Sequence, residues 1–382
     1  MYRQAEVFRS SATWPIGGTY RQELPDSGML AGISIHVSAT PKTDTMLTTV
    51  KWRLEDFVSE LKIVGNGNRT IKALTGQMQK ALAFIGGAPS LLDKAFNYGA
   101  STWRFHTFIP FGRNPFDVEC GLDLSAWDSV ELQFTNDGSS TYFTGDWSIT
   151  VILHWLREAA GAFSRGYFKT EEWRKWTTVS DEWKYLDLPT ENKLRKLVMQ
   201  VLAACTTNAV ADCTPYNVAY EIKFKLRSGA VDVFNGNLRD LWYDNAYRLG
   251  QVPLVGLEAY HTAAYGIHTG LGQSLAVGGV KLPHTAAENT YAPSIIPGDD
   301  GQTLRHYNAS SGEQDGLIVA GLAFENCAFF PFDVPDVPES YLDLKADGTV
   351  KLDVHTRSGS DYDNGTIRVV LDQLIAHQGP SD

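Results

Sequence analysis

The sequence has no run of basic residues, no long apolar segment and few cysteines, and each shortage excludes a class of protein. With 33 Lys and Arg against 44 Asp and Glu, its formal net charge is −11. Nucleic-acid phosphates are met by clustered Lys and Arg, so direct binding to nucleic acid is not expected. No stretch reaches the roughly 18 apolar residues that span a bilayer, and residues 1–9 lack the apolar core of a signal peptide. The sequence therefore predicts a chain that is made and kept in soluble form.

Only four cysteines occur, at Cys120, Cys205, Cys213 and Cys327. Cys205 and Cys213 form one pair with no matching second pair, which is weak support for zinc, and buried or unreactive thiols are favoured. A reducing compartment is the simplest interpretation.

What the sequence does contain is a pattern that occurs twice. Residues 108–111 (FIPF) recur as 329–332 (FFPF), 122–124 as 342–344, 130–132 as 350–352, and 149–153 as 367–371. Subtracting the positions gives offsets of 221, 220, 220 and 218, so four separate strings keep their register. These strings consist of apolar strand residues and proline turns, which indicates that the duplicated feature is architecture.

The repeat extends towards the N-terminus with smaller offsets. Leu24-Pro25 matches Leu188-Pro189 at an offset of 164, and residues 61–63 match 222–224 at an offset of 161. The rise from 161 to 221 places about 60 extra residues in the second copy, roughly between Trp242 and Asp315. Loops tolerate insertions of that size, so this stretch is predicted to form long loops.

Strand signals dominate each copy. In residues 32–39, Ile33, Ile35 and Val37 alternate with polar residues, which is the period of a half-buried strand. Residues 57–71 predict two strands joined at the turn 65–68 (GNGN); this turn lacks the remaining residues of a phosphate-binding loop, so a hairpin is favoured. One short helix is predicted over 74–84. The fold class is all-β, with two tandem antiparallel sandwiches of eight strands and a few short helices.

The domain boundaries follow from the repeat. We expect an N-terminal arm over residues 1–19, a first sandwich over 20–157 and a second sandwich over 184–382 that carries the inserted loops 242–315. The connector, 158–183, contains Trp173, Trp176 and Trp183 and is predicted to pack against both sandwiches, because a flexible linker is poor in aromatics.

The sequence predicts no catalytic, cofactor-binding or metal-binding residues. There is no His-x-His metal motif and no Gly-x-Ser-x-Gly nucleophile elbow. His36, His154 and His355 fall on predicted polar strand faces, and the pair His261 and His268 is favoured as surface loop, with metal binding as the alternative. Residues 361–365 (DYDNG) resemble a calcium loop but lack its distal Glu, which favours a turn. Acidic residues that we expect to be solvated rather than paired for glycoside hydrolysis are Asp299, Asp300, Asp315, Asp336 and Glu339.

The duplicated sandwich, the Leu-Pro before each copy and the enlarged second copy together resemble a viral family. From about Leu24 to about Leu374 the chain is similar to the double jelly-roll major capsid proteins of the tectivirus and adenovirus-hexon lineage, in particular those of tailless icosahedral prokaryotic viruses with an internal membrane. The resemblance implies a non-enzymatic virion protein without a cofactor. It implies homotrimers with a hexagonal outline that tile an icosahedral capsid, and synthesis in the host cytoplasm.

The same resemblance implies partners. These are the chain itself, neighbouring trimers, minor capsid or penton proteins and the internal viral membrane, with the insertion building an outer tower and the N-terminal arm lying low. Two alternatives remain open at this point: a tandem jelly-roll hydrolase or lectin acting on glycans, and a trimeric spike or adhesin.

Overall fold

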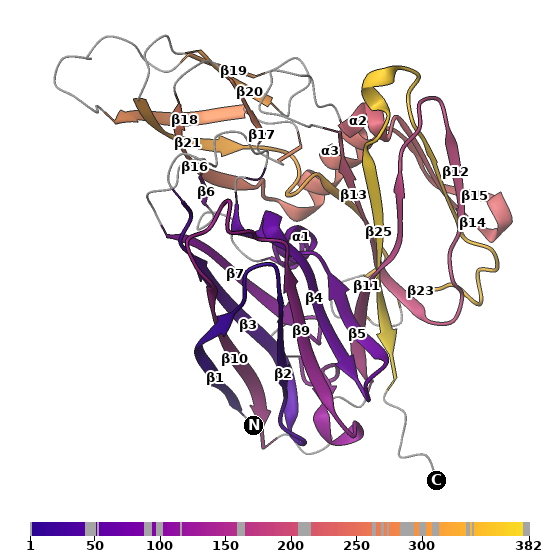
Figure 1. The fold of residues 1–382 in the computed structure, drawn as a ribbon. Coiled ribbons are helices and arrows are strands. Elements are labelled where there is room, and N and C mark those ends of the chain that lie inside the picture. The colour runs from indigo at the N-terminus through magenta and orange to yellow at the C-terminus, as the bar shows by residue number, and fades with distance from the viewer. Residues whose placement is uncertain are drawn as a thin grey trace.

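Short strands with alternating apolar residues form two β-sandwiches, which lie side by side in the computed structural model of the chain (Figure 1). In the first of them Ile33, Ile35 and Val37 are at most 1% exposed whereas His36 between them is exposed, as the alternation predicts. The structure describes residues 2–376 except 43–50, 52, 88–93, 97–101, 115–116, 159–164, 205–214, 262–264, 269–270, 273–274, 283–293, 298–302, 308–312, 334–336 and 338–339.

The first sandwich packs two antiparallel sheets around one core. One sheet has the order β1-β10-β3-β7, with a short β8 beside β3, and the other has the order β2-β9-β4-β5. The strands are β1 (Tyr2–Trp14), β2 (Thr19–Glu23), β3 (Met29–Ala39), β4 (Val58–Gly65), β5 (Arg69–Leu74), β7 (Trp103–Pro110), β8 (Leu122–Asp123), β9 (Val130–Asn136) and β10 (Trp147–Arg157). In the core, the rings of Trp14 and Trp147 meet edge to face at 5.4 Å between centroids.

The second sandwich repeats this arrangement strand for strand. Its sheets have the orders β11-β25-β13-β22, with β23 beside β13, and β12-β24-β14-β15. The strands are β11 (Tyr167–Thr177), β12 (Trp183–Asp187), β13 (Lys193–Leu202), β14 (Glu221–Leu226), β15 (Val231–Gly236), β22 (Cys327–Pro331), β23 (Leu342–Asp343), β24 (Lys351–His355) and β25 (Thr366–Ile375). The repeated strings lie on matching strands, β7 with β22, β8 with β23, β9 with β24 and β10 with β25. The predicted pair of antiparallel sandwiches is confirmed; each has eight strands of five or more residues and one two-residue strand, β8 or β23.

Two segments differ from the sequence expectation in the same way. Residues 1–19, expected as an arm, contain β1, which pairs with β10 from Tyr2 to Trp14. Residues 158–183, expected as a connector, contain β11, which occupies the equivalent place beside β25. Each is the first strand of its copy. The pattern of β1 was missed because β1 is an edge strand whose residues are mostly exposed, so it lacks apolar alternation.

Helices follow the same duplication. The predicted short helix is α1 (Gly76–Ile85), which follows β5, and α3 (Leu238–Leu249) follows β15 at the matching position of the second copy. Each begins after a capping side chain, Thr75 for α1 and Asn237 for α3, that accepts a bond from a backbone N–H of the first turn. A further one-turn helix is α2 (Pro215–Val218).

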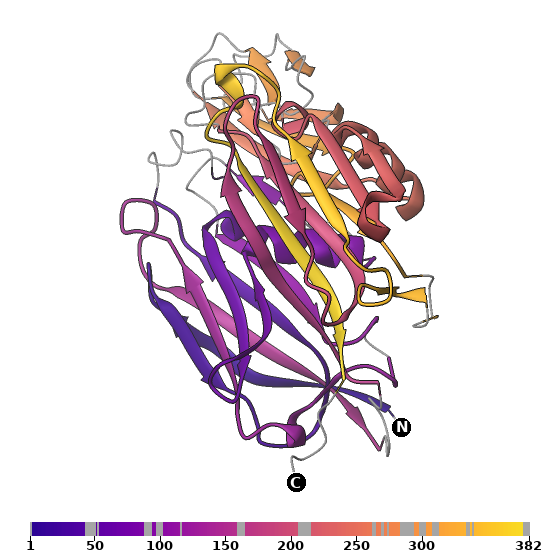
Figure 2. The same cartoon turned by 90° about the vertical axis from the view of Figure 1, so that its right-hand side faces the viewer.

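The insertion forms strands rather than long loops. One sheet has the order β18-β21-β16-β6, in which β6 comes from the first copy, and another has the order β17-β20-β19. Both lie at the end of the molecule opposite the start of β1 and the end of β25 (Figures 1 and 2). The glycines inside β18 hid its pattern, because glycine contributes no apolar side chain to a strand. The strands are β6 (Lys94–Phe96), β16 (Leu254–His261), β17 (Tyr265–His268), β18 (Leu275–Leu282), β19 (Ser294–Pro297), β20 (Thr303–Tyr307) and β21 (Glu313–Ala320).

Candidate assembly surfaces

The joint between the two sandwiches is a strand contact. β5 of the first sandwich pairs in parallel with β11 of the second, with Lys72 opposite Thr170 and Ala73 opposite Glu171. One sheet therefore runs from β2 through β5 and β11 to β22, across both sandwiches. Backbone hydrogen bonds fix the position of the two sandwiches relative to each other.

Helix α1 fills the joint with apolar side chains. Met78, Ala81, Phe84 and Ile85 form a buried cluster with residues of the second sandwich, and Phe84 stacks on Phe324 at 5.8 Å. The cluster members from the second sandwich lie on β13, β22 and β25 or in the turn before β22. They are Val198, Phe324, Cys327, Phe329 and Val370. A dry contact of this kind is rigid, because the packed side chains have no alternative arrangement of similar energy.

Among the described strands, the two that match β5 and β11 each have one edge without a strand partner, called here the free edge. β1 matches β11 and lies at the edge of its sheet, where Tyr2 is 53% and Val7 is 59% exposed. β15 matches β5 and also lies at a sheet edge, with Val231 and Val233 exposed. Edge strands with exposed apolar residues are templates for pairing with another chain.

The strand registers show which residues correspond. Glu6 lies opposite Leu153 as Glu171 lies opposite Leu371, and the repeat equates Leu153 with Leu371, so Glu6 matches Glu171. The repeat equates Ile63 with Phe224. Lys72 pairs with Ile63 and Phe234 pairs with Phe224, so Phe234 matches Lys72.

Helix α3 exposes the positions at which α1 is buried. Counted from their N-caps, Ala81 and Ile85 of α1 correspond to Tyr243 and Tyr247 of α3. Tyr243 is 52% and Tyr247 is 89% exposed. Large aromatic side chains in this position are typical of protein interfaces, where their apolar area becomes buried.

The histidines expected on polar strand faces lie in different surroundings. His36 is exposed, with its ring edge against His106 at 4.7 Å. His154 is only 7% exposed, since Arg3 donates to its Nδ1 at 2.6 Å and Phe108 packs on its ring. Burial, together with the charge of Arg3, lowers the pKa of His154 to about 4. His154 lies on β10, and Arg3, which covers it, belongs to β1.

His355 is stacked face to face on Trp183 at 4.7 Å. Its Nε2 lies 3.2 Å from Asp181 Oδ1. These contacts fix the ring on the outer face of the second sandwich.

Several other residues singled out in the sequence lie outside the described part of the chain. Those whose placement is not described are Cys205, Cys213, Asp299, Asp300, Asp336 and Glu339. His261, His268 and Asp315 belong to strands of the inserted sheets, but the description does not extend to their side chains. Ser360–Tyr362, in the calcium-like segment, forms a one-turn helix. Among the described residues, no three His, Cys, Asp or Glu side chains are grouped to hold a metal ion.

Two further features concern membranes and thiols. Within the described ranges, no helix is both long enough and apolar enough to cross a bilayer. Cys120 and Cys327 are buried free thiols. Burial raises the pKa of both thiols, in the case of Cys120 to about 12.

Solved structures share this arrangement over nearly the whole chain. The STIV MCP superposes with a TM-score of 0.59 at 11% identity, covering 99% of this chain and 98% of that one. The major capsid protein P2 of bacteriophage PM2 superposes with a TM-score of 0.53 at 9% identity, covering 99% and 100%. This chain has the double jelly-roll fold. The PBCV-1 virus capsid chain shares the double jelly roll too, with a TM-score of 0.52 at 11% identity, covering 97% and 93%.

Sequence comparison alone does not find these double jelly rolls. No protein-family model matches the chain, and no curated protein sequence matches it. The fold is shared at identities near 10%, and cores accept many hydrophobic substitutions when volume and patterning are kept.

Proposed function

We propose that the chain is a major capsid protein whose copies form homotrimers, and that the trimers tile an icosahedral shell. The fold is that of capsid proteins from several icosahedral viruses, and it is retained over the full length of the chain. The role is structural and needs no catalytic site. The protein acts in the virion, after synthesis in the host cytoplasm.

The observation that carries this proposal is the pair of unsatisfied edges. The contact of β5 with β11 joins the two halves of one chain, and in the part of the chain that the structure describes the matching strands β15 and β1 each have one unpaired edge. Repeating the contact between chains places β15 of one copy beside β1 of the next. A head-to-tail contact of this kind makes a closed ring when its rotation divides the circle evenly. Three copies with two sandwiches each then give six similar units.

The exposed face of α3 supports the same contact. In the internal joint α1 packs on Val198 and Val370 of the second sandwich, which match Ser34 and Ile152 on the outer face of the first. In the trimer, Tyr243 and Tyr247 of one copy then lie against this face of its neighbour. Within the shell, the further partners of the trimer are neighbouring trimers, minor capsid or penton proteins and the internal membrane.

Light scattering on the full chain at micromolar concentration tests the oligomer. We expect a species of three times the mass of one chain and, by electron microscopy, particles with a hexagonal outline or closed shells. Val7→Lys and Val233→Lys each place a charge on one free edge, which opposes strand addition, and each is expected to yield monomers. Val179→Lys, at an exposed residue outside both edges, is the matched control and stays trimeric. A monomeric or dimeric wild-type protein would refute the proposal.

A further inference from the structure

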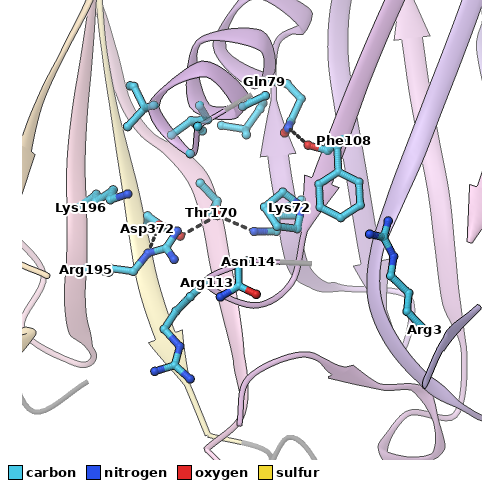
Figure 3. A pocket seen from close by; sticks show the side chains of 17 residues that line it. Arg3, Lys72, Gln79, Phe108, Arg113, Asn114, Thr170, Arg195, Lys196 and Asp372 are labelled. Carbon is cyan, nitrogen blue, oxygen red and sulfur yellow. Dashed lines mark hydrogen bonds and ion pairs between the residues drawn. The ribbon is translucent and has the colours of Figure 1, made fainter. Parts of the chain in front are cut away.

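A cavity of about 340 Å³ lies between the two sandwiches, next to α1 (Figure 3). Ligand pockets in proteins are commonly 300 to 1,000 Å³, so this volume is at the small end of that range. Five cationic side chains and one carboxylate line the cavity. The cations are Arg3, Lys72, Arg113, Arg195 and Lys196, and the carboxylate is Asp372.

Two of the cations at the cavity are balanced by carboxylates outside its lining. Arg113 donates to both carboxylate oxygens of Asp117 at 2.7 Å and to Glu119 at 2.8 Å. Lys196 Nζ lies 3.6 Å from Asp333. These ion pairs hold their side chains in place and leave little net charge of their own.

The charges at the base of the cavity are not balanced in this way. Lys72 Nζ donates to Thr170 Oγ1 at 2.7 Å, and Thr170 Oγ1 in turn donates to Asp372 Oδ1 at 2.9 Å. Arg195 Nε donates to the other oxygen of the same carboxylate, Asp372 Oδ2, at 2.7 Å. Lys72 is 4% and Asp372 is 2% exposed. Two cations thus share one carboxylate in a buried group, which leaves a net charge of +1.

An uncompensated buried charge is costly, and a bound anion is one way to remove that cost. Burial is the main cause that lowers the pKa of Lys72 to about 8, against the favourable charge of Asp372. The ammonium group is therefore still protonated at neutral pH. It has three N–H donors, of which Thr170 accepts one.

The cavity lining also contains apolar side chains. They are Leu74 at the end of β5, Leu82 and Ile85 on α1, and Phe108 and Pro110 at the end of β7. Apolar walls with a few convergent polar groups are typical of sites for amphipathic small molecules.

We propose that this cavity binds an amphiphile through an anionic head group, either a carboxylate or a phosphate, at Lys72 and Arg195. Its apolar chain lies along Leu74, Leu82 and Ile85. The site is built within one chain. Its head-group residues lie on β5 and β13, and β1 contributes only Arg3 to the lining. The ligand stabilises the joint by bridging groups from both sandwiches.

Calorimetric titration of the full-length protein with four probes tests the assignment. Decanoate and decyl phosphate carry both features, whereas decanol has no charge and inorganic phosphate has no chain. We expect decanoate and decyl phosphate to bind at one site per chain, at least tenfold more tightly than decanol or phosphate. The stronger of the two identifies the head group. Affinity is expected to fall as the pH rises above about 8, since Lys72 then loses its proton.

Two variants locate the site. Lys72→Met removes the charge and keeps the apolar stem, and Leu82→Trp fills the cavity from the α1 side; each is expected to abolish binding. Lys184→Met changes a cation on β12 outside the cavity and is expected to bind as the wild type does. If Lys72→Met does not fold, Leu82→Trp still tests the location and the probe series still tests the charge. Equal binding of decanol and decanoate, or undiminished binding by Leu82→Trp, would overturn the proposal.

Discussion

Arg53 Nη2 lies 2.5 Å from Glu325 Oε1, and the two side chains are 5% and 1% exposed although they belong to different sandwiches. Arg53 precedes a short helix of the first sandwich, and Glu325 lies in the turn before β22. The same guanidinium lies over the ring of Phe324, 5.6 Å from its centroid. This buried ion pair therefore connects the two sandwiches within their apolar contact.

Replacing Arg53 by Met is expected to destabilise the protein by about 3 to 5 kcal/mol, because Glu325 is left as a buried charge without this partner. Urea unfolding followed by tryptophan fluorescence measures the change. Arg21→Met is the matched control, since Arg21 pairs with Glu131 at the surface and is 62% exposed. Its expected cost is about 1 kcal/mol or less. Equal losses of unfolding free energy in the two variants would show that the buried pair stabilises the protein no more than the surface pair does.

Replacing Tyr247 by Ser is expected to weaken association between copies without affecting the fold of one chain. The side chain is 89% exposed in the single chain, so its removal costs the isolated fold little. In the proposed trimer it becomes buried, and losing a large aromatic contact there costs about 2 kcal/mol or more. Concentration-dependent light scattering measures association. Tyr185→Ser, on β12 and 70% exposed, is the control; comparable trimer dissociation in both variants would contradict the assignment of the α3 face.

His154 is expected to make stability depend on pH. Its pKa is about 4 in the folded protein, against about 6.5 for a free imidazole. Between these values the unfolded chain binds more protons, so this stabilisation is complete above about pH 6.5 and is lost as the pH falls towards 4. The difference between these two pKa values corresponds to about 3 kcal/mol.

The matched measurement is the free energy of unfolding at pH 7 and pH 4.5, for the wild type and for His154→Gln. Carboxylates titrate in both proteins, so the difference between them isolates the imidazole. We expect the wild type to lose more stability than the variant on acidification. Identical losses would mean that His154 is not the group responsible.

The thiols of Cys120 and Cys327 are expected to resist alkylation in the native protein. Both are buried and both have a raised pKa, so little thiolate is present or accessible at pH 7.5. Iodoacetamide treatment with peptide-level mass spectrometry measures modification at each site. Modification is expected only after unfolding in urea. Rapid labelling of either residue in the native state would contradict the burial that the fold assigns to it.

The sequence was sufficient to predict the duplicated strands, because their inward positions are selected for apolar character. The string at 149–153 returns at 367–371 for this reason, since β10 and β25 are central strands with both neighbours paired. The edge strand β1 carries no such constraint on its exposed residues, so its sequence predicts an arm rather than a strand. β11 was obscured by its polar, tryptophan-containing composition, which resembled a packed connector.

The joint and the cavity could not be predicted in the same way. The contact of β5 with β11 consists of two residue pairs from segments far apart in sequence, and parallel pairing leaves no turn signal between its strands. Lys72 is an unremarkable strand residue until Thr170, Arg195 and Asp372 are brought around it by three other strands. Such groupings arise from the long-range fold, which local periodicity does not encode.

The angle between the two sandwiches is fixed inside a single chain, by the β5–β11 backbone bonds and by the side chains beneath α1. This fixed angle would set the curvature of an assembly made from several copies of the chain. In the proposed trimer the same angle recurs at every contact, so a substitution that tilts one sandwich would turn the ring into an open spiral. The geometry of such an assembly would be set during folding, before any two copies meet.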